Sequence, residues 1–197
     1  MMTKILILYY SQHGTTEKMA HQIARGVESG DNAETLIRTV PEISTVCEQT
    51  ESAIPEKGAP FVTLADLKTC DGLALGSPTH FGNMAGALKH FIDQTTELWF
   101  AGSLSGKPAG VFTSSSAMHT GHESTLLSMM LPLMHHGMLI MSVPCNEIAL
   151  KETITGGTPY GPSHLSTAHD LSGDEKKICR ALGRRLAQTA TALKNIS

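Results

Sequence analysis

Three short polar segments of the chain carry residue types that can bind a ligand. They are SQHGTT (residues 11–16), SPTHFGNM (residues 77–84) and TSSSAMHTGHE (residues 113–123). The first segment has hydroxyl groups and a glycine but no lysine or arginine, and it links an apolar run to a helical pattern. A turn at such a place presents unpaired backbone N–H groups and the positive end of a helix dipole. Because these features attract anions, the segment indicates a phosphate site.

The first segment offers neutral donors to such an anion. Ser11, Thr15 and Thr16 supply hydroxyl groups, and Gly14 lets the backbone curl around the ligand without a Cβ clash. The segment contains neither the GK[ST] of a Walker loop nor the GxGxxG of a dinucleotide-binding turn. A plain helix-capping turn is the alternative interpretation of this segment.

Strand-like and helix-like segments alternate around these polar residues. Apolar or alternating runs predict five strands, at residues 5–10, 33–40, 71–78, 108–116 and 138–143. Helical periodicity predicts helices at residues 15–28, 84–95 and 123–136, the last kinked at Pro132. A capping-box pattern at residues 172–175 opens a final helix. Residues 41–60 and 144–171 are expected to be loops.

This alternation predicts a mainly parallel sheet with right-handed crossovers. Five strands suit an α/β fold, a flavodoxin-like doubly wound parallel sheet in the order 2-1-3-4-5, within one domain spanning residues 1–197. The three polar segments follow strands one, three and four, so they are expected at the same carboxyl edge of the sheet. Their convergence is the strongest internal indication of a ligand site.

The composition narrows the classes of function. A net charge of −3 gives no basic footprint for nucleic acid, and no apolar run is long enough to span a membrane. No signal-peptide pattern opens the chain, so a cytoplasmic location is expected. The widely spaced Cys47, Cys70, Cys145 and Cys179 are expected to be reduced thiols. The ten histidines lack the spacing of a metal site.

Several motifs together resemble the WrbA-type flavodoxin-like NAD(P)H:quinone oxidoreductases, and the resemblance covers nearly the whole chain. The motifs are LYYSQHGTTEKMA, GSPTHFGNMAGALKHFIDQT, LW, GKPAGVFTSSS, HHGM and GGTPYG. The resemblance implies FMN as cofactor, a homotetramer, and two-electron reduction of quinones by NADH or NADPH. It implies a ping-pong reaction in which the nicotinamide and the quinone use one flavin face in turn.

The resemblance also implies a set of site residues. The FMN phosphate loop corresponds to Ser11, Gln12, His13, Gly14, Thr15 and Thr16. The segment along the isoalloxazine ring corresponds to Pro78, Thr79, His80 and Phe81, and the loop at its pyrimidine side to Ser114, Ser115, Ser116, Ala117 and Met118. Trp99 resembles an aromatic wall that a neighbouring subunit contributes, and Phe81 is expected to form a second wall. His135 resembles the histidine that faces the nicotinamide or quinone, where it would act in catalysis.

Other interpretations stay open at this point. A non-enzymatic electron carrier like the short-chain flavodoxins is one alternative, although such carriers are usually strongly acidic. A regulatory flavin-binding module without turnover is another. At the residue level, Trp99 could be generic packing in a loop, and His135 could be a favourable cation at a helix end. Histidines at positions 13 and 80 and a cysteine at 145 depart from the commonest family pattern.

Overall fold

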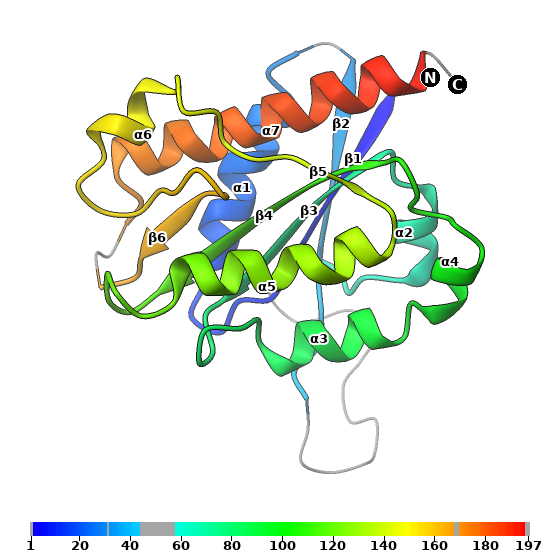
Figure 1. Cartoon of the computed structure of the whole chain (residues 1–197), viewed down its shortest axis with the longest axis horizontal. Coiled ribbons are helices and arrows are strands. Elements are labelled where there is room, and N and C mark those ends of the chain that lie inside the picture. The colour runs from blue at the N-terminus through cyan, green and yellow to red at the C-terminus, as the bar shows by residue number, and fades with distance from the viewer. Residues whose placement is uncertain (1, 31, 44–57, 168–169, 196–197) are drawn as a thin grey trace.

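The computed structural model describes residues 2–30, 32–43, 58–167 and 170–195. Strands and helices alternate along most of the chain (Figure 1). The strands are β1 (Thr3–Tyr9), β2 (Ala33–Thr39), β3 (Gly72–Pro78), β4 (Pro108–Ser115), β5 (Leu139–Ile140) and β6 (Ser163–Leu165). The helices are α1 (Thr15–Val27), α2 (Leu64–Thr69), α3 (Gly86–Asp93), α4 (Thr96–Phe100), α5 (His122–His135), α6 (Ile148–Glu152) and α7 (Gly173–Lys194).

The strands form one parallel sheet whose path runs β2-β1-β3-β4-β5. This path confirms the predicted flavodoxin-like order. Strand β1 lies between β2 and β3, and the chain reverses its direction across the sheet beside it. In such a sheet the carboxyl ends of β1 and β3 are the expected place for a ligand.

Helices cover both faces of the sheet (Figure 1). Along β1, successive side chains point to opposite faces, so Ile5 and Ile7 pack with helices α1 and α7, whereas Leu6 and Leu8 face α3 and α5. Because both faces are covered, nearly every residue of β1 is buried, as is usual for a parallel strand. The sheet is therefore a rigid support for the loops at its edge.

Helices α1 and α7 cross with their backbones in close approach. A Cβ atom on Gly26 would lie 2.2 Å from the carbonyl oxygen of Arg180, and one on Gly183 would lie 2.1 Å from that of Ile23. Only glycine fits at these two places. This contact fixes the direction of α1, and with it the position of its amino end at the carboxyl edge of the sheet.

The predicted fifth strand, residues 138–143, is largely wrong. Only Leu139 and Ile140 pair with the amino end of β4, after which the chain leaves the sheet. Strand β6 then pairs in parallel with residues 113–115 at the carboxyl end of β4. Residues 144–171, predicted as a loop, therefore include α6 and β6. The apolar pattern of residues 138–143 does not mark a continuous strand. At its end, Val143 is buried against Ala149 and Ile178.

Two other boundaries differ from the sequence prediction. The helix predicted at residues 84–95 ends at Asp93, because the Thr95 hydroxyl donates to the Ile92 carbonyl oxygen at 2.7 Å and closes the last turn. Trp99, predicted to lie in a loop, belongs to the short helix α4 that follows. Pro132 lies within the last turn of α5, which continues to His135. Most of the loop predicted at residues 41–60 lies outside the described residues.

Candidate functional site

Three loops meet at the carboxyl edge of the sheet. The first loop (residues 10–14) follows β1, the second (residues 79–85) follows β3, and the third (residues 116–121) follows β4. The Thr16 hydroxyl, at the start of α1, lies 3.0 Å from the hydroxyl of Ser114, at the end of β4. The Thr79 N–H donates to the Ser114 carbonyl oxygen at 2.8 Å. The structure therefore brings together the three segments that sequence analysis grouped.

The first loop ends in a helix start that its own side chains do not cap. Gly14 is the N-cap of α1, with a φ of 78°, and no side chain bonds to the free N–H groups of the first turn. Helices α2 and α7 each begin with a complete capping box, whereas α3, α4, α5 and α6, like α1, have no side-chain cap. The four N–H groups at the start of α1 are thus available to an anion, and the helix dipole favours one there.

Two further observations at the first loop fit a phosphate group. The Ser11 hydroxyl oxygen is buried and has no hydrogen-bond partner among the described residues. A Cβ atom on Gly14 would have one neighbour within 4 Å, the Glu17 carboxylate at 4.0 Å, so the backbone here borders open space. A buried hydroxyl without a partner is costly, and a bound phosphate oxygen would satisfy it. The loop therefore fits the phosphate of FMN.

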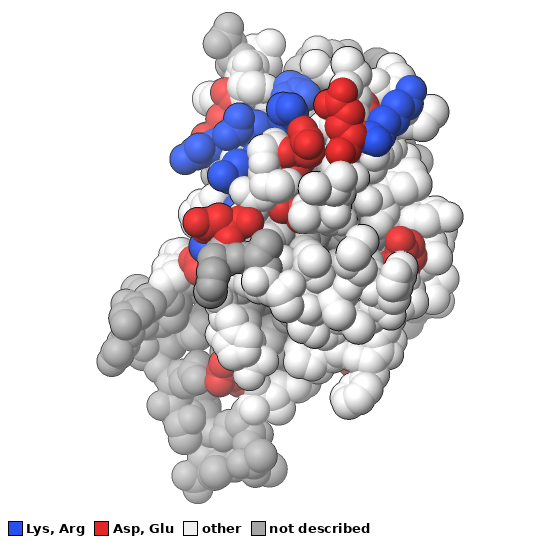
Figure 2. Space-filling model, turned by 90° about the vertical axis from the view of Figure 1, so that its left-hand side faces the viewer, with Lys and Arg blue, Asp and Glu red and all other residues white. Residues whose placement is uncertain are grey.

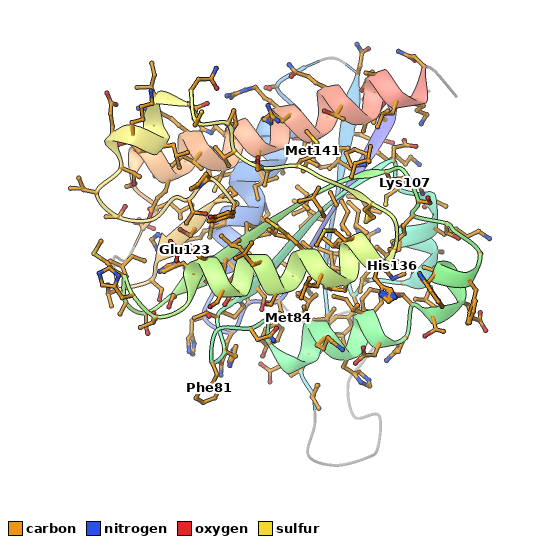
Figure 3. All side chains as sticks on the ribbon, viewed as in Figure 1. Phe81, Met84, Lys107, Glu123, His136 and Met141 are labelled. Carbon is orange, nitrogen blue, oxygen red and sulfur yellow. The ribbon has the colours of Figure 1, made fainter. Side chains whose placement is uncertain are left out.

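The second loop holds an aromatic side chain in a strained position. Phe81 has a φ of 52° and is fully exposed. A positive φ at a bulky residue is an outlier that costs free energy, and such strain is concentrated at functional sites. His80 and Asn83 exchange backbone hydrogen bonds, which closes the turn beneath Phe81. The loop thus presents an apolar ring outward from the sheet edge (Figure 3).

The second and third loops pack against each other through glycine. A Cβ atom on Gly121 would lie 3.0 Å from the Cα atom of Gly82, and both glycines have positive φ. The Thr79 hydroxyl also donates to the Gly121 carbonyl oxygen at 3.3 Å. Predicted site residues Ser114 and Ser115 are buried, whereas Ser116, Ala117 and Met118 are exposed. Residues 116–118 can therefore contact a ligand directly, whereas Ser114 and Ser115 only support the loop.

His122, at the start of α5, is a residue that sequence analysis did not single out. Its side chain is 5% exposed, and its Nε2 atom lies 3.1 Å from the Ala117 carbonyl oxygen. Because a carbonyl can only accept, Nε2 carries the proton of this bond. The bond holds the third loop to the amino end of α5. In the sequence, only the Gly-His pair at positions 121–122 marks this position, and two residues are too few to predict that His122 holds the loop.

The three loops lack basic side chains but border two acidic ones, Glu17 and Glu123. Figure 2 shows one face of the molecule, on which lysine and arginine side chains gather in the upper part, with acidic side chains among and below them. None of residues 10–16, 77–85 and 114–122 is a lysine or an arginine. Binding of an anionic ligand at the edge must therefore depend on backbone N–H groups, hydroxyl groups and the dipole of α1.

Trp99 and His135 lie together, but not beside the three loops. The Trp99 Nε1 atom donates to the His135 carbonyl oxygen at 2.9 Å, and the two rings meet edge to face at 5.5 Å. His135 ends α5, whose first residue adjoins the third loop, and 14 residues of helix span about 20 Å. Figure 3 shows Phe81 near one end of α5 and His136 at the other. Within one chain, the structure does not bring His135 to the loops.

His136 helps to hold Trp99 and His135 in place. Its Nε2 atom lies 2.8 Å from the Thr95 hydroxyl oxygen, and its Nδ1 atom is buried with no partner among the described residues. Burial, and then the neighbouring His135, lower the pKa of His136. A neutral imidazole here links the end of α5 to the turn before α4, and so fixes Trp99 relative to His135.

The described residues contain no group of three or more histidine, cysteine, aspartate or glutamate side chains that could hold a metal ion. None of the described helices combines the length and the apolar composition needed to cross a membrane.

Comparison with known proteins identifies relatives of the chain. Residues 3–151 match the family model described as NADPH-dependent FMN reductase. Two relatives, each named NAD(P)H dehydrogenase (quinone), come from Syntrophobacter fumaroxidans and Geobacter sulfurreducens. Each is 40% identical to this chain, and each alignment covers 96% of this chain and 98% of the relative.

Solved structures share the fold. A flavodoxin, WrbA-like protein from Agrobacterium tumefaciens has a TM-score of 0.68 at 22% identity, over 96% of this chain and 98% of that one. A flavodoxin from the domain Archaea has a TM-score of 0.63 at 20% identity, over 96% and 99% of the two chains.

The parallel sheet order, the helices on both of its faces and the similarity to solved flavodoxin-like structures define a protein of the flavodoxin-like class. More narrowly, the chain belongs to the NADPH-dependent FMN reductase family. This membership confirms the predicted class of enzyme, an NAD(P)H-dependent flavin oxidoreductase, and confirms FMN as the predicted cofactor.

Proposed function

We propose that this chain catalyses the two-electron reduction of quinones by NADH or NADPH, with FMN bound at the carboxyl edge of the sheet. The observation that carries the proposal is the uncapped start of α1 beside the buried, unpartnered Ser11 hydroxyl. The names of the two relatives support the quinone as second substrate. When bound, FMN supplies the chemistry by accepting a hydride from a nicotinamide and passing electrons on.

The residues of the first loop bind and orient the phosphate. Backbone N–H groups at the start of α1 and the hydroxyl groups of Ser11 and Thr15 donate to it. The buried Thr16 hydroxyl already lies 3.0 Å from that of Ser114, so it couples the start of α1 to β4. Gln12 and His13 are exposed and border the ligand from outside.

The second and third loops position the ring system. Phe81 offers an exposed apolar surface to it, next to Pro78, Thr79 and His80. The exposed residues Ser116, Ala117 and Met118 contact the polar side of the ring through backbone groups. An exposed edge leaves one ring face open to a nicotinamide and then to a quinone. Both substrates therefore use the same face in turn, which makes the reaction ping-pong.

A second copy of the chain completes the pocket. Trp99 and Phe100 are exposed aromatic side chains that one chain leaves about 20 Å from its own loops. Leu127, Leu131 and Met134 form an exposed apolar stripe along α5, at the spacing of one helix face. An apolar stripe of this kind favours association. We infer a homotetramer in which Trp99 and His135 of one copy face the flavin site of another.

In this arrangement His135 donates a hydrogen bond to a quinone oxygen as that oxygen becomes negative. Such a donor stabilises developing charge most strongly where water is excluded. Trp99, packed edge to face against His135, holds the imidazole and covers the substrate with apolar surface.

The three described cysteines, Cys70, Cys145 and Cys179, are free thiols, which supports our placement of the enzyme in the cytoplasm.

Steady-state kinetics test this proposal. Oxidation of NADH and of NADPH is followed with the FMN-loaded protein at several benzoquinone concentrations. We expect oxidation that depends on quinone and gives parallel double-reciprocal plots, with excess quinone inhibiting competitively against the nicotinamide. Trp99→Ala should weaken both substrates while FMN content stays near that of the wild type. Intersecting plots, or a Trp99→Ala enzyme that loses affinity for only one substrate, would show two separate sites.

A further inference from the structure

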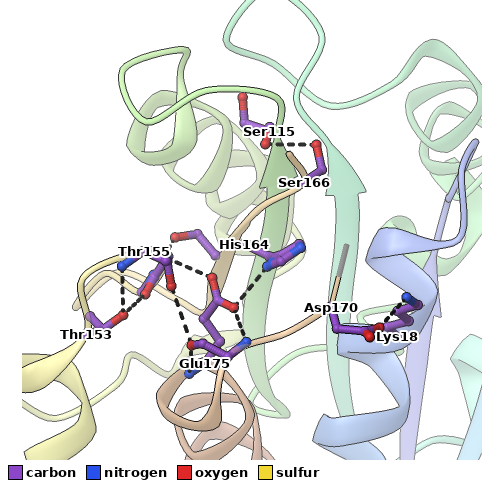
Figure 4. Close-up of polar contacts among 12 residues, drawn as sticks. Lys18, Ser115, Thr153, Thr155, His164, Ser166, Asp170 and Glu175 are labelled. Carbon is purple, nitrogen blue, oxygen red and sulfur yellow. Dashed lines mark hydrogen bonds and ion pairs between the residues drawn. The ribbon is translucent and has the colours of Figure 1, made fainter. Parts of the chain in front are cut away.

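A buried histidine–carboxylate pair lies behind the third loop, outside the residues that are proposed to contact a ligand. Glu175 and His164 are 1% and 2% exposed, and the Glu175 Oε2 atom lies 3.0 Å from the His164 Nδ1 atom (Figure 4). The carboxylate also accepts from the Ser172 N–H at 2.7 Å and from the Gly156 N–H at 2.8 Å. Both of its oxygens are therefore satisfied by protein groups.

The stability of the fold does not by itself explain this pair. A buried carboxylate loses its hydration, and well-packed apolar residues of similar volume are often as stable as a buried polar pair, or more so. What a buried pair does supply is a strict geometric requirement, since it must be satisfied in one arrangement. Burial would raise the pKa of Glu175, but the hydrogen bonds from His164 and the Ser172 backbone lower it to about 2. The carboxylate is thus ionised wherever the enzyme works.

The His164–Glu175 pair joins strand β6 to helix α7. Glu175 is the third residue of α7 and closes the capping box with Ser172. His164 is the central residue of β6, opposite Ser114 of β4. A Cβ atom on Gly156 would lie 2.1 Å from the Ser163 carbonyl oxygen, so the turn at Gly156 also packs directly on β6. One carboxylate therefore sets the position of β6 against α7.

Strand β6 in turn holds the base of the third loop. The N–H and the hydroxyl of Ser166 both donate to the Ser115 carbonyl oxygen, at 2.7 and 3.0 Å (Figure 4). Ser115 is the last residue of β4, and its hydroxyl contacts that of Thr120 across the loop. Thr120 donates to the Ala117 carbonyl oxygen at 2.7 Å. A shift of β6 would therefore move residues 116–121.

We propose that the His164–Glu175 pair positions the third loop, and thereby sets the affinity of FMN at that loop and the ring's surroundings. This inference rests on the proposed placement of FMN beside residues 116–118. The pair acts through β6 and touches no ligand, so both members are positioning residues. They differ in this respect from Ser11, whose hydroxyl is proposed to donate to the phosphate itself.

The test compares Glu175→Gln with Asp66→Asn. Asp66 is also the third residue of a helix with a capping box, and it also accepts from a cation, Arg38 Nε at 3.2 Å. It lies in α2, away from the third loop, so it controls for loss of a capped, paired carboxylate. For each variant we measure thermal stability, the Kd for FMN, the visible circular dichroism of the FMN-loaded protein, and local hydrogen exchange.

We expect Glu175→Gln to raise the Kd for FMN by about fivefold or more, because the loop is no longer held in its binding position. Its visible circular dichroism should change, and exchange should quicken in residues 115–122 even without FMN. Asp66→Asn should lose stability but leave all three unchanged. Equal effects of the two variants on FMN, or unchanged exchange in residues 115–122 of Glu175→Gln, would overturn the positioning role.

A milder variant covers the case in which Glu175→Gln does not fold. Ser166→Ala removes one bond to the Ser115 carbonyl oxygen and keeps the backbone bond. It should raise the Kd for FMN by about twofold and quicken exchange in the same residues. No change in either would contradict the proposal. Failure of the wild-type chain to bind FMN would instead contradict the proposed function, while the exchange experiment on the unloaded protein still tests the pair.

Discussion

At the scale of single residues, the binding edge depends on uncharged donors. An anion at the first loop meets N–H groups and hydroxyl groups, with no lysine or arginine in residues 10–16. Sequence analysis could single out this loop as a candidate because its pattern of strand, polar turn and helix is local. It did not separate the roles of the two threonines, since only the structure shows the Thr16 hydroxyl against Ser114.

The paired substitution Thr15→Val and Thr16→Val should weaken FMN binding at least about tenfold. A hydrogen bond to a charged group contributes roughly 1.5–3 kcal/mol, and valine keeps nearly the same volume. Thr15→Val alone should account for most of the loss, because Thr16 shares its hydroxyl with Ser114. A flavin fluorescence titration measures both effects. Unchanged affinity in the double variant would place the phosphate elsewhere.

At position 81, the stability of the fold and the activity of the enzyme should favour different residues. Its positive φ costs about 1–2 kcal/mol for a residue with a Cβ atom, and glycine avoids most of that cost. Phe81→Gly should therefore be more stable than Phe81→Ala, by about 1 kcal/mol in urea unfolding. Both variants should reduce turnover, because both lose the exposed ring. Equal stability of the two variants would show that the backbone at this position is not strained.

At the scale of elements, the sequence predicted what depends on local pattern and missed what depends on distant partners. The buried run of β1 and the amphipathic face of α1 can be recognised from their own sequences. The alternation of strands and helices along the chain then predicts a parallel sheet. The sequence pattern does not reveal that β5 and β6 both pair with β4. Strand β6 has only three residues, and its partners are distant in sequence: residues 113–115 of β4 and, for His164, Glu175 of α7. The short helix α4 was missed for a similar reason, since Trp99 is held by the carbonyl of His135.

Helix α7 should lose stability in acid through Glu175. Its pKa is lowered in the folded state from an ordinary 4.5 to about 2, so the ionised carboxylate favours folding above pH 4.5. That contribution, about 3 kcal/mol, should fall away as the pH drops from about 4.5 to 2. Urea unfolding of the wild type and Glu175→Gln should differ most at neutral pH and converge near pH 2. A difference that does not depend on pH would contradict this account.

At the scale of the whole molecule, the predicted site residues fall into two groups at opposite ends of α5. The three loops lie at the start of this helix, and Trp99 and His135 lie at its end. Neither composition nor spacing could reveal this separation, because it follows from how α5 lies along the sheet. The exposed stripe of Leu127, Leu131 and Met134 between the two ends is the surface on which we expect another copy to pack.

Leu131→Glu should divide the proposed homotetramer. A carboxylate in the centre of an apolar interface loses its hydration without gaining a partner, so association should weaken by two orders of magnitude or about 3 kcal/mol. Light scattering should show smaller species that keep FMN and lose most quinone reduction. Lys89→Glu, on the exposed face of α3, is the control and should leave assembly intact. A wild-type monomer with full quinone reductase activity would refute the shared pocket.

The central claim is that the chain passes two electrons from a nicotinamide to a quinone through FMN at one site. Anaerobic rapid mixing tests it most directly, with the visible absorbance of the flavin as the signal. We predict that NADH or NADPH alone removes the absorbance of oxidised flavin, and that one benzoquinone per FMN, added afterwards, restores it completely. No loss of absorbance with either nicotinamide, or reoxidation that passes through a flavin semiquinone, would contradict the account.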